Sequence, residues 1–244
     1  MKRMLVFAGR NVRELLRDPL TIGFGAAFPL LLLLLLTLIS RNTPKEIFTV
    51  DSLTPGIAVF GLSFFSLFSG MLVAKDRSTS FLMRLFASPL TAADFIAGYT
   101  LPLLPLALIQ AVLCYAAALA MGLPFSLSVL RAVLAVLPAA VLYIAIGLLA
   151  GSALNDKQVG GLCGAMLTNV SVICSGAWFP IDLVGKGFRT FCNVLPFSHA
   201  VELGRCVLND TYDGIGVHLA VVCAYALIIF VLAVFTFRRA AKRG

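Results

Sequence analysis

Six long apolar stretches recur along the chain, and none of them contains Lys, Arg, Asp or Glu. They fall near residues 20–40, 54–74, 99–121, 132–154, 159–179 and 217–237. About 20 apolar residues are enough for a helix to cross the hydrocarbon core of a bilayer. Barrel strands would instead show segments of roughly 10 residues with alternating polarity, whereas residues 31–36 are all Leu. The pattern predicts an all-α polytopic membrane protein with six transmembrane helices in a single domain, residues 1–244.

Residues 1–18 precede the first apolar stretch and have the periodicity of an amphipathic helix. Apolar residues such as Ala8 and Leu15 share one face. Four arginines fall largely elsewhere on this helix: Arg3, Arg10, Arg13 and Arg17. Such a helix lies in the membrane interface with its arginines near anionic lipid head groups. Pro19 then predicts a break before the first span.

Two of the segments between spans are longer than a simple turn. The first, residues 75–98, begins with charged residues, continues as a short helix rich in Leu and Phe, and stops at a Ser-Pro step. Its candidate functional residues are Asp76, Arg77, Phe81, Arg84, Leu85, Phe86, Ser88 and Pro89. The aromatic residues of such a helix would be exposed to water unless they contact either lipid or a soluble partner protein. The second segment, residues 175–216, predicts two short external helices that re-enter the outer leaflet or lie on its surface.

Composition and charge agree with a membrane protein and orient it. Hydrophobic residues make up 60% of the chain and charged residues 12%, with a mean hydropathy of +1.01, against about 25% charged residues in soluble domains. Thirteen of the 19 Lys and Arg residues fall on the side that carries both termini, and the positive-inside rule makes that side cytoplasmic. We therefore expect a multi-pass protein of the plasma membrane. The basic residues are dispersed at span ends, which disfavours nucleic acid as a partner.

The sequence contains no motif for a catalytic or metal site. There is no Gly-x-x-x-x-Gly-Lys-Ser/Thr phosphate loop and no His-Glu-x-x-His pair. We therefore expect no catalytic residue, no metal ligand and no cofactor bound by this chain. Ion-coupled transporters usually need ionisable groups within the membrane, and the six stretches have none. Energy from outside the membrane is favoured, although sodium coupling through backbone oxygens leaves a stand-alone secondary transporter as an alternative. A membrane-embedded enzyme is disfavoured.

Mildly polar residues within the spans have two interpretations. Serines recur at every third position of the second stretch, and the fifth contains a Thr-Asn pair. They serve either helix packing or the wall of a path for an amphipathic or hydrophobic passenger. The candidate path residues are Ser63, Phe64, Ser66, Phe68, Thr168 and Asn169.

Six cysteines are present, and most lie in the apolar stretches, where they act as small buried hydrophobic residues. Cys192 and Cys206 share the second long segment, and a disulfide between them is one alternative.

The chain resembles the type-2 exporter permeases of the ATP-binding-cassette (ABC) superfamily over almost its whole length. The resemblance rests on three places: the basic helix before the first span, the stretch from Lys75 to Asp94 with its charged start, its Leu/Phe helix and its Ser88-Pro89 step, and Trp178-Phe-Pro followed by the stretch from Leu195 to Arg205 before the last span. The family usually opens its docking loop with a glutamate, a basic pair and a glycine. Here Asp76 would take the place of the acidic contact.

The resemblance implies an assembly of two permeases, identical or homologous, with two cytoplasmic ATPase subunits that bind ATP and Mg²⁺. In such an assembly, residues 75–98 would be the coupling segment and spans two and five would line the interface between permeases. In its short loops, the chain is most similar to the branch of the family that exports drugs, antibiotics and natural products. A permease for lipids or glycan polymers is the alternative within the family.

Overall fold

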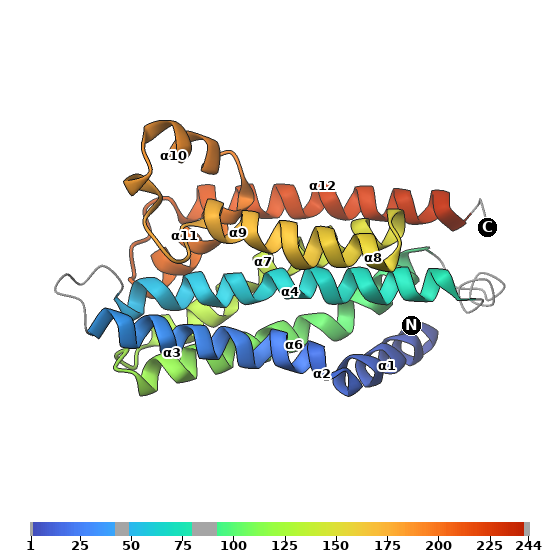
Figure 1. The fold of residues 1–244 in the computed structure, drawn as a ribbon, viewed down its shortest axis with the longest axis horizontal. Coiled ribbons are helices and arrows are strands. Elements are labelled where there is room, and N and C mark those ends of the chain that lie inside the picture. The colour runs from blue at the N-terminus through green and yellow to red at the C-terminus, as the bar shows by residue number, and fades with distance from the viewer. Residues whose placement is uncertain (1, 42–48, 80–91, 242–244) are drawn as a thin grey trace.

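The long helices of the chain run side by side along one axis (Figure 1). The computed structural model describes residues 2–41, 49–79 and 92–241, and within these ranges it contains helices and no strand. The elements before the second loop are α1 (Lys2–Arg17), α2 (Pro19–Ile22), the π-helix η1 (Gly23–Ala27), α3 (Phe28–Arg41) and α4 (Val50–Ser78). The later elements are α6 (Ala92–Ala120), α7 (Leu127–Ala153), α8 (Asp156–Val159), the π-helix η2 (Gly160–Leu167), α9 (Thr168–Ser175), the 3₁₀ helix η3 (Ile181–Leu183), α10 (Lys186–Cys192), α11 (Pro196–Leu208) and α12 (Ile215–Ala241).

Six helical stretches are long and apolar enough to cross a membrane, which confirms the predicted fold class. They are Gly23–Ser40, Val50–Ser78, Asp94–Ala120, Leu127–Ala153, Asp156–Ser175 and Ile215–Arg239. The second stretch extends four residues beyond the predicted apolar run at each end. The fifth ends at Ser175, before residue 179, because Gly176 adopts a left-handed conformation with φ 69°.

The helix α4 lies at the centre of the bundle, with 89% of its most apolar window buried, against 22% for the first span and 17% for α12. Its closest neighbour is α7, and small residues make the approach tight. A Cβ added to Gly147 would lie 2.0 Å from the Ser66 carbonyl oxygen, and one added to Gly151 would lie 2.3 Å from the Gly70 carbonyl oxygen. Small residues of this kind let helix backbones meet inside a membrane, where lipid provides no hydrophobic driving force between helices.

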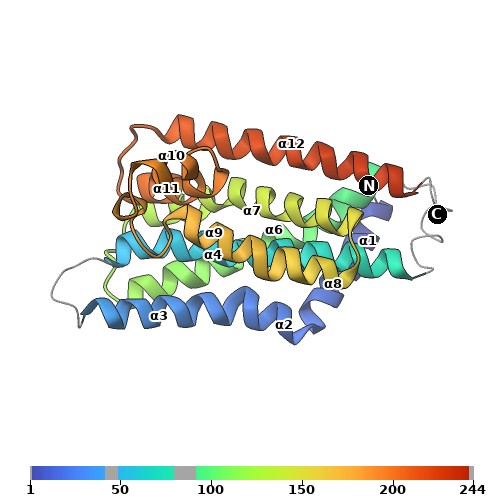
Figure 2. The ribbon, with the colours of Figure 1, turned by 45° about the horizontal axis from the view of Figure 1, so that its top comes forward.

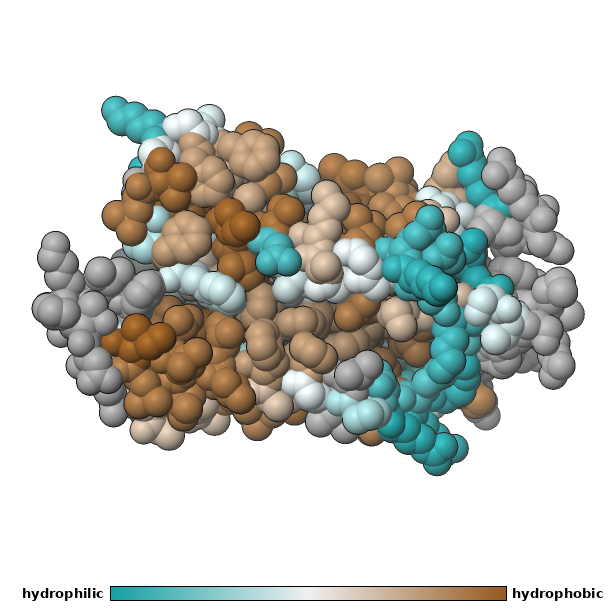
Figure 3. Space-filling view, viewed as in Figure 1, coloured by the Kyte–Doolittle hydropathy of each residue, from teal (hydrophilic) through white to brown (hydrophobic). Residues whose placement is uncertain are grey.

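The two ends of the bundle differ in what they carry (Figures 1 and 2). α1, the end of α4, the start of α6 and the end of α12 lie at one end, called here the N/C end; α10 and α11 lie at the opposite end. Figure 3 shows hydrophilic residues gathered mainly toward the N/C end, while the visible surface over α3 is hydrophobic. Apolar residues that would be unfavourable in water are exposed on the outer helices, among them Leu31, Leu227 and Phe235.

The first and fifth spans are interrupted by glycine-containing π-helices at their N/C halves. η1 carries Gly23 and Gly25, and η2 carries Gly160, Gly161 and Gly164. Apart from the backbone of the same helix, the described residues place no atom within 4 Å of a Cβ added to Gly23, Gly160 or Gly161, so packing among them does not account for these three glycines. Since π-helical turns are rare and occur often at functional sites, the two interrupted spans single out the N/C half of the molecule.

The second predicted long segment contains the expected short helices, α10 and α11. α11 packs against α7, α12 and α4, and Arg205 fastens it. The Arg205 guanidinium donates to the carbonyl oxygens of Ser52 (3.2 Å) and Gly176 (2.8 Å) and pairs with Glu202 (2.8 Å). One arginine thus ties α11 to the start of α4 and to the end of α9.

The loop before α12 is held to the start of α7 by Asp210. Its carboxylate accepts hydrogen bonds from Ser128 and Tyr212, both 2.9 Å long, and lies 3.3 Å from Arg131. The hydrogen bond from Tyr212 is the main cause that lowers the pKa of Asp210, and Ser128 and Arg131 add to it.

All six cysteines are free thiols in the structure, so the alternative of a Cys192–Cys206 disulfide is not realised in it. Cys192 is fully buried and interacts with the thiol of Cys174 at the end of α9, while Cys206 is half-buried. The last residue of α10 therefore points inward, toward the end of α9.

Candidate functional site

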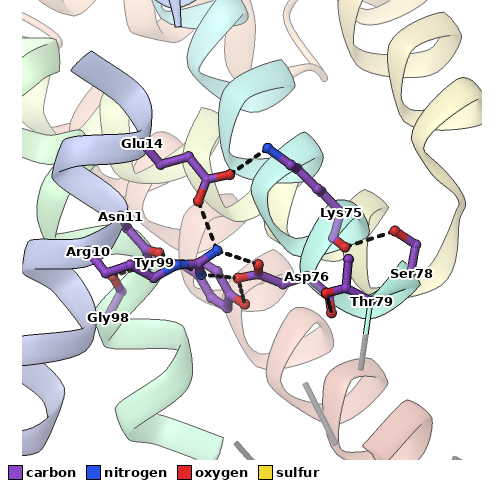
Figure 4. A network of polar contacts seen from close by, with 9 residues as sticks. All are labelled: Arg10, Asn11, Glu14, Lys75, Asp76, Ser78, Thr79, Gly98 and Tyr99. Atoms are coloured by element: carbon purple, nitrogen blue, oxygen red, sulfur yellow. Dashed lines mark hydrogen bonds and ion pairs between the residues drawn. The ribbon is translucent and has the colours of Figure 1, made fainter. Parts of the chain in front are cut away.

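A network of polar contacts joins α1, α4 and α6 at the N/C end (Figure 4). Its residues are Arg10, Asn11 and Glu14 of α1, Lys75, Asp76 and Ser78 at the end of α4, Thr79 just after it, and Gly98 and Tyr99 near the start of α6. The network lies at the junction between the second and third spans, where the chain leaves α4 and returns in α6.

The Arg10–Asp76 pair lies at the centre of this network. The two Arg10 amino groups donate to the two Asp76 carboxylate oxygens, at 2.6 and 2.8 Å. The Asp76 side chain is only 4% exposed, and the Tyr99 hydroxyl donates a third hydrogen bond to it at 2.9 Å. The bond with Asp76 raises the pKa of Arg10. A bidentate contact of this kind fixes the orientation of the two side chains as well as their distance, so α1 docks on α4 in one defined position.

Glu14 extends the network to a second basic residue of α4. Its carboxylate lies 2.9 Å from the Arg10 guanidinium and 2.7 Å from the Lys75 ammonium. Positive and negative groups therefore alternate along the seam between α1 and the end of α4. Within this seam the ionised groups compensate one another.

The other side of α1 is seated on α6. The buried Asn11 donates to the Gly98 carbonyl oxygen at 3.0 Å, and the Phe7 ring packs edge-on against Phe95 and Tyr99. A Cβ on Gly98 would lie 2.4 Å from the Phe7 ring, so the absent side chain makes room for that ring. α1 is consequently a docked part of the bundle as well as an amphipathic helix.

The predicted interfacial arginines have different surroundings in the structure. Arg10 points into the network, while Arg13 and Arg17 are exposed, and neither forms an ion pair with any described residue. Arg3 lies within α1. The sequence pattern gave all four the same role because they share basic character, whereas their positions around the helix separate Arg10 from the other two.

The residues predicted for coupling to a partner fall in two groups. Phe81, Arg84, Leu85, Phe86, Ser88 and Pro89 lie outside the described residues. Asp76 and Arg77 are described, and both have partners within the chain. Arg77 donates to the carbonyl oxygens of Gly151 (2.8 Å) and Leu154 (3.3 Å) at the end of α7. α4 therefore enters the predicted coupling segment with its last turn fastened to α1, α6 and α7.

The candidate path residues on α4 lie within the bundle. Ser63 and Ser66 are fully buried, and their hydroxyls donate to the carbonyl oxygens of Phe60 and Ser63, at 2.7 and 2.6 Å. This placement favours the packing interpretation for both serines. Phe64 is buried among Phe28 and other rings.

On the fifth span, Thr168 is buried and donates to the Cys163 carbonyl oxygen at 3.0 Å. Asn169 is exposed and donates to the Ala165 carbonyl oxygen at 2.8 Å. Thr168 therefore faces the interior of the bundle, whereas Asn169 lies on its outer surface.

A cavity of about 710 Å³ lies beside the polar network, between α1 and α2 on one side and α8 on the other, with α4 as its floor. Phe68, one of the predicted path residues, lines it together with Arg13, Arg17 and Met71. Sequence reasoning did not find this cavity, because its residues come from segments up to 146 positions apart in the chain, from Arg10 to Asp156.

These features define a polytopic α-helical membrane protein whose N/C end ties two consecutive spans to a docked amphipathic helix. A family model described as "ABC-2 type transporter" matches residues 3–208, and the chain belongs to this family of membrane transport proteins.

Two relatives carry the name "Nodulation protein J". The one from Bradyrhizobium diazoefficiens is 33% identical over 75 residues, which cover 30% of this chain and 28% of the relative. The one from Rhizobium meliloti is 30% identical over 66 residues, 27% of this chain and 25% of the relative. The match thus spans about a quarter of the length of either relative.

Proposed function

We propose that the chain is the membrane-spanning permease subunit of an ATP-driven ABC exporter. Two permeases, identical or homologous, would combine with two cytoplasmic ATPase subunits that bind ATP and Mg²⁺. The passenger would be an amphipathic or hydrophobic compound such as a drug, antibiotic or natural product, moved out of the cytoplasm across the plasma membrane. The N/C end would face the cytoplasm, because the basic side of a membrane protein is retained there.

The network around Arg10 and Asp76 is the observation that carries this proposal. It holds the last turn of α4 and the first turns of α6, the two elements that flank the predicted coupling segment. A displacement imposed on that segment would reach α1, α4 and α6 together, since charged hydrogen bonds and ring packing join them. Mechanical coupling of this kind supplies work to spans that have no ionisable group in their apolar stretches.

The test is reconstitution of the chain with the ABC ATPase encoded nearest to it. We expect the two proteins to co-purify, and lipid-reconstituted complexes to hydrolyse ATP in a passenger-dependent manner. Arg10→Ala should reduce the passenger-dependent part of the ATPase rate more than the basal part. Arg238→Ala is the matched control, because Arg238 is an exposed arginine at the same end of the bundle, outside the network.

Two results would contradict the proposal. One is passenger movement by the purified chain in ATP-free vesicles, which would make it a stand-alone transporter. The other is unchanged assembly and unchanged coupling after deletion of residues 81–87, since the ATPase would then act elsewhere.

A further inference from the structure

The cavity beside the polar network has a basic edge and an apolar floor. Arg13 and Arg17 lie at the edge, on α1, and the floor is formed on α4 by Leu67, Phe68, Met71 and Leu72. Met71 is 41% exposed, so its thioether faces a space that a ligand can reach. The volume of about 710 Å³ lies within the usual range of small-molecule sites.

The basic residues that line this cavity outnumber the acidic ones by one, with Arg10, Arg13, Arg17 and Lys75 against Glu14, Asp18 and Asp156. Arg10 and Lys75 are paired with Asp76 and Glu14, and the Asp18 carboxylate accepts a hydrogen bond from the uncharged Thr21 at the start of α2. Arg13 and Arg17 are four residues apart and therefore share one face of α1. Since neither has an ion pair with any described residue, their two positive charges remain available at the cavity edge.

Asp156 is the acidic residue on the opposite wall. It occupies the first turn of the helix that continues through η2 and α9, and Asn155 caps that turn by accepting from the Gln158 backbone N–H at 3.0 Å. The N-terminus of a helix carries a partial positive charge that offsets a carboxylate there. The excess of positive charge is therefore on the α1 side, away from Asp156.

We propose that this cavity receives an anionic amphiphile, with its phosphate or carboxylate head at Arg13 and Arg17 and its hydrocarbon part on Leu67, Phe68 and Met71. The inference rests on the proposed export function and names the class of passenger that the cytoplasmic side would accept. The floor of this cavity belongs to α4, and its edges belong to α1, α2 and α8. The occupant would therefore lie between these elements and not on the outer helices α3 and α12.

The test uses the full-length chain in phosphatidylcholine nanodiscs and a fluorescent probe, dansylaminoundecanoic acid, with its methyl ester as the uncharged counterpart. We expect the acid to bind about tenfold more tightly than the ester, because two partly solvated arginines each contribute a modest ion pair. The double variant Arg13→Gln/Arg17→Gln should abolish this preference. The control Arg238→Gln/Arg239→Gln removes two arginines at the end of α12 and should keep it.

A second variant tests the floor independently of charge. Met71→Trp narrows the cavity and should weaken acid and ester by the same factor. Equal binding of acid and ester by the unchanged protein, or a preference that survives loss of both arginines, would overturn the inference. So would native mass spectrometry that finds a phosphatidylglycerol molecule held through Arg13 and Arg17 and not displaced by the probe, because the site would then belong to a bilayer lipid.

These measurements use the permease alone, so their failure is distinguishable from failure of the proposed function. A chain that prefers the acid but neither binds nor stimulates an ATPase would contradict the exporter proposal. A chain with normal ATPase coupling and no preference for the acid would contradict only the anionic class of passenger.

Discussion

Replacement of Arg10 by Ala should destabilise the protein substantially, because it leaves a buried carboxylate behind. In the variant, Asp76 keeps the Tyr99 hydroxyl as a donor but loses both bonds from the guanidinium. Removal of one partner of a buried ion pair costs about 3–5 kcal/mol. The Arg10 side chain is itself 37% exposed, so water can enter behind it and solvate the carboxylate. We therefore expect a loss of about 2–3 kcal/mol in the free energy of unfolding.

The milder variant Asp76→Asn separates charge from hydrogen bonding. The amide oxygen can still accept from Tyr99 and Arg10, and the guanidinium keeps its contact with Glu14. We expect a loss of about 1 kcal/mol. The double variant Arg10→Ala/Asp76→Asn should be more stable than the sum of the two single effects predicts, because no buried charge is then left unpaired.

Unfolding can be followed in mixed micelles by titration with sodium dodecyl sulfate. The chain has a single tryptophan, Trp178, whose ring packs on Phe60 at a centroid distance of 5.5 Å and reports on the bundle at a distance from the network. Arg238→Ala serves as the control and should change the unfolding free energy by less than about 0.5 kcal/mol. If Arg10→Ala fell within that same limit, the reasoning about the buried pair would be refuted.

Three further predictions concern other parts of the structure. Gly147→Ala should cost about 3 kcal/mol and lower the yield of monodisperse protein in size-exclusion chromatography, because its Cβ would meet backbone of α4; Gly160→Ala, which has open space around it, should leave the yield unchanged. Arg205→Lys cannot keep all three contacts of the guanidinium, so α11 and the neighbouring α10 should become more mobile. In a variant that retains only Cys192, maleimide should then label this buried thiol faster. An unchanged labelling rate would contradict the role of Arg205 in holding α11. The pKa of Asp210 is lower in the folded protein than in the unfolded chain. Its carboxylate therefore stabilises the fold at any pH above its unfolded pKa, and this stabilisation is lost as the pH falls through its folded pKa. Asp210→Asn should lower the melting temperature near neutral pH, and the melting temperatures of the two proteins should become equal in acid.

The six spans were predictable because lipid demands long uninterrupted apolar runs, and this demand acts on each segment separately. The apolar runs do not reveal how the spans are arranged relative to one another. Lipid tails and protein interiors are both apolar, so hydropathy alone could not show that α4 is buried whereas α12 is exposed. Small residues were the available signal, and Gly147 and Gly151 indeed mark the α4–α7 contact.

The polar network was predictable only in part. The sequence placed Arg10 and Asp76 on the same side of the membrane, but the choice of partner depends on how α1 docks. That docking is decided by shape, through the notch at Gly98 that accepts Phe7. The buried face of α1 contains Phe7 and Asn11, whereas a hydrophobicity pattern does not assign a buried face to an asparagine.

The helix α4 has a partner at each of its ends. Near its start the Ser52 carbonyl oxygen is held by Arg205 of α11, and near its end Asp76 is held by Arg10. At about 1.5 Å per residue its 29 residues form a rod about 43 Å long, clamped along its length by α7. A displacement of one end along the helix axis is transmitted to the other end, because closely packed protein interiors have low compressibility. α4 is therefore a stiff mechanical link between the end of the bundle that carries the predicted coupling segment and the end that carries α11.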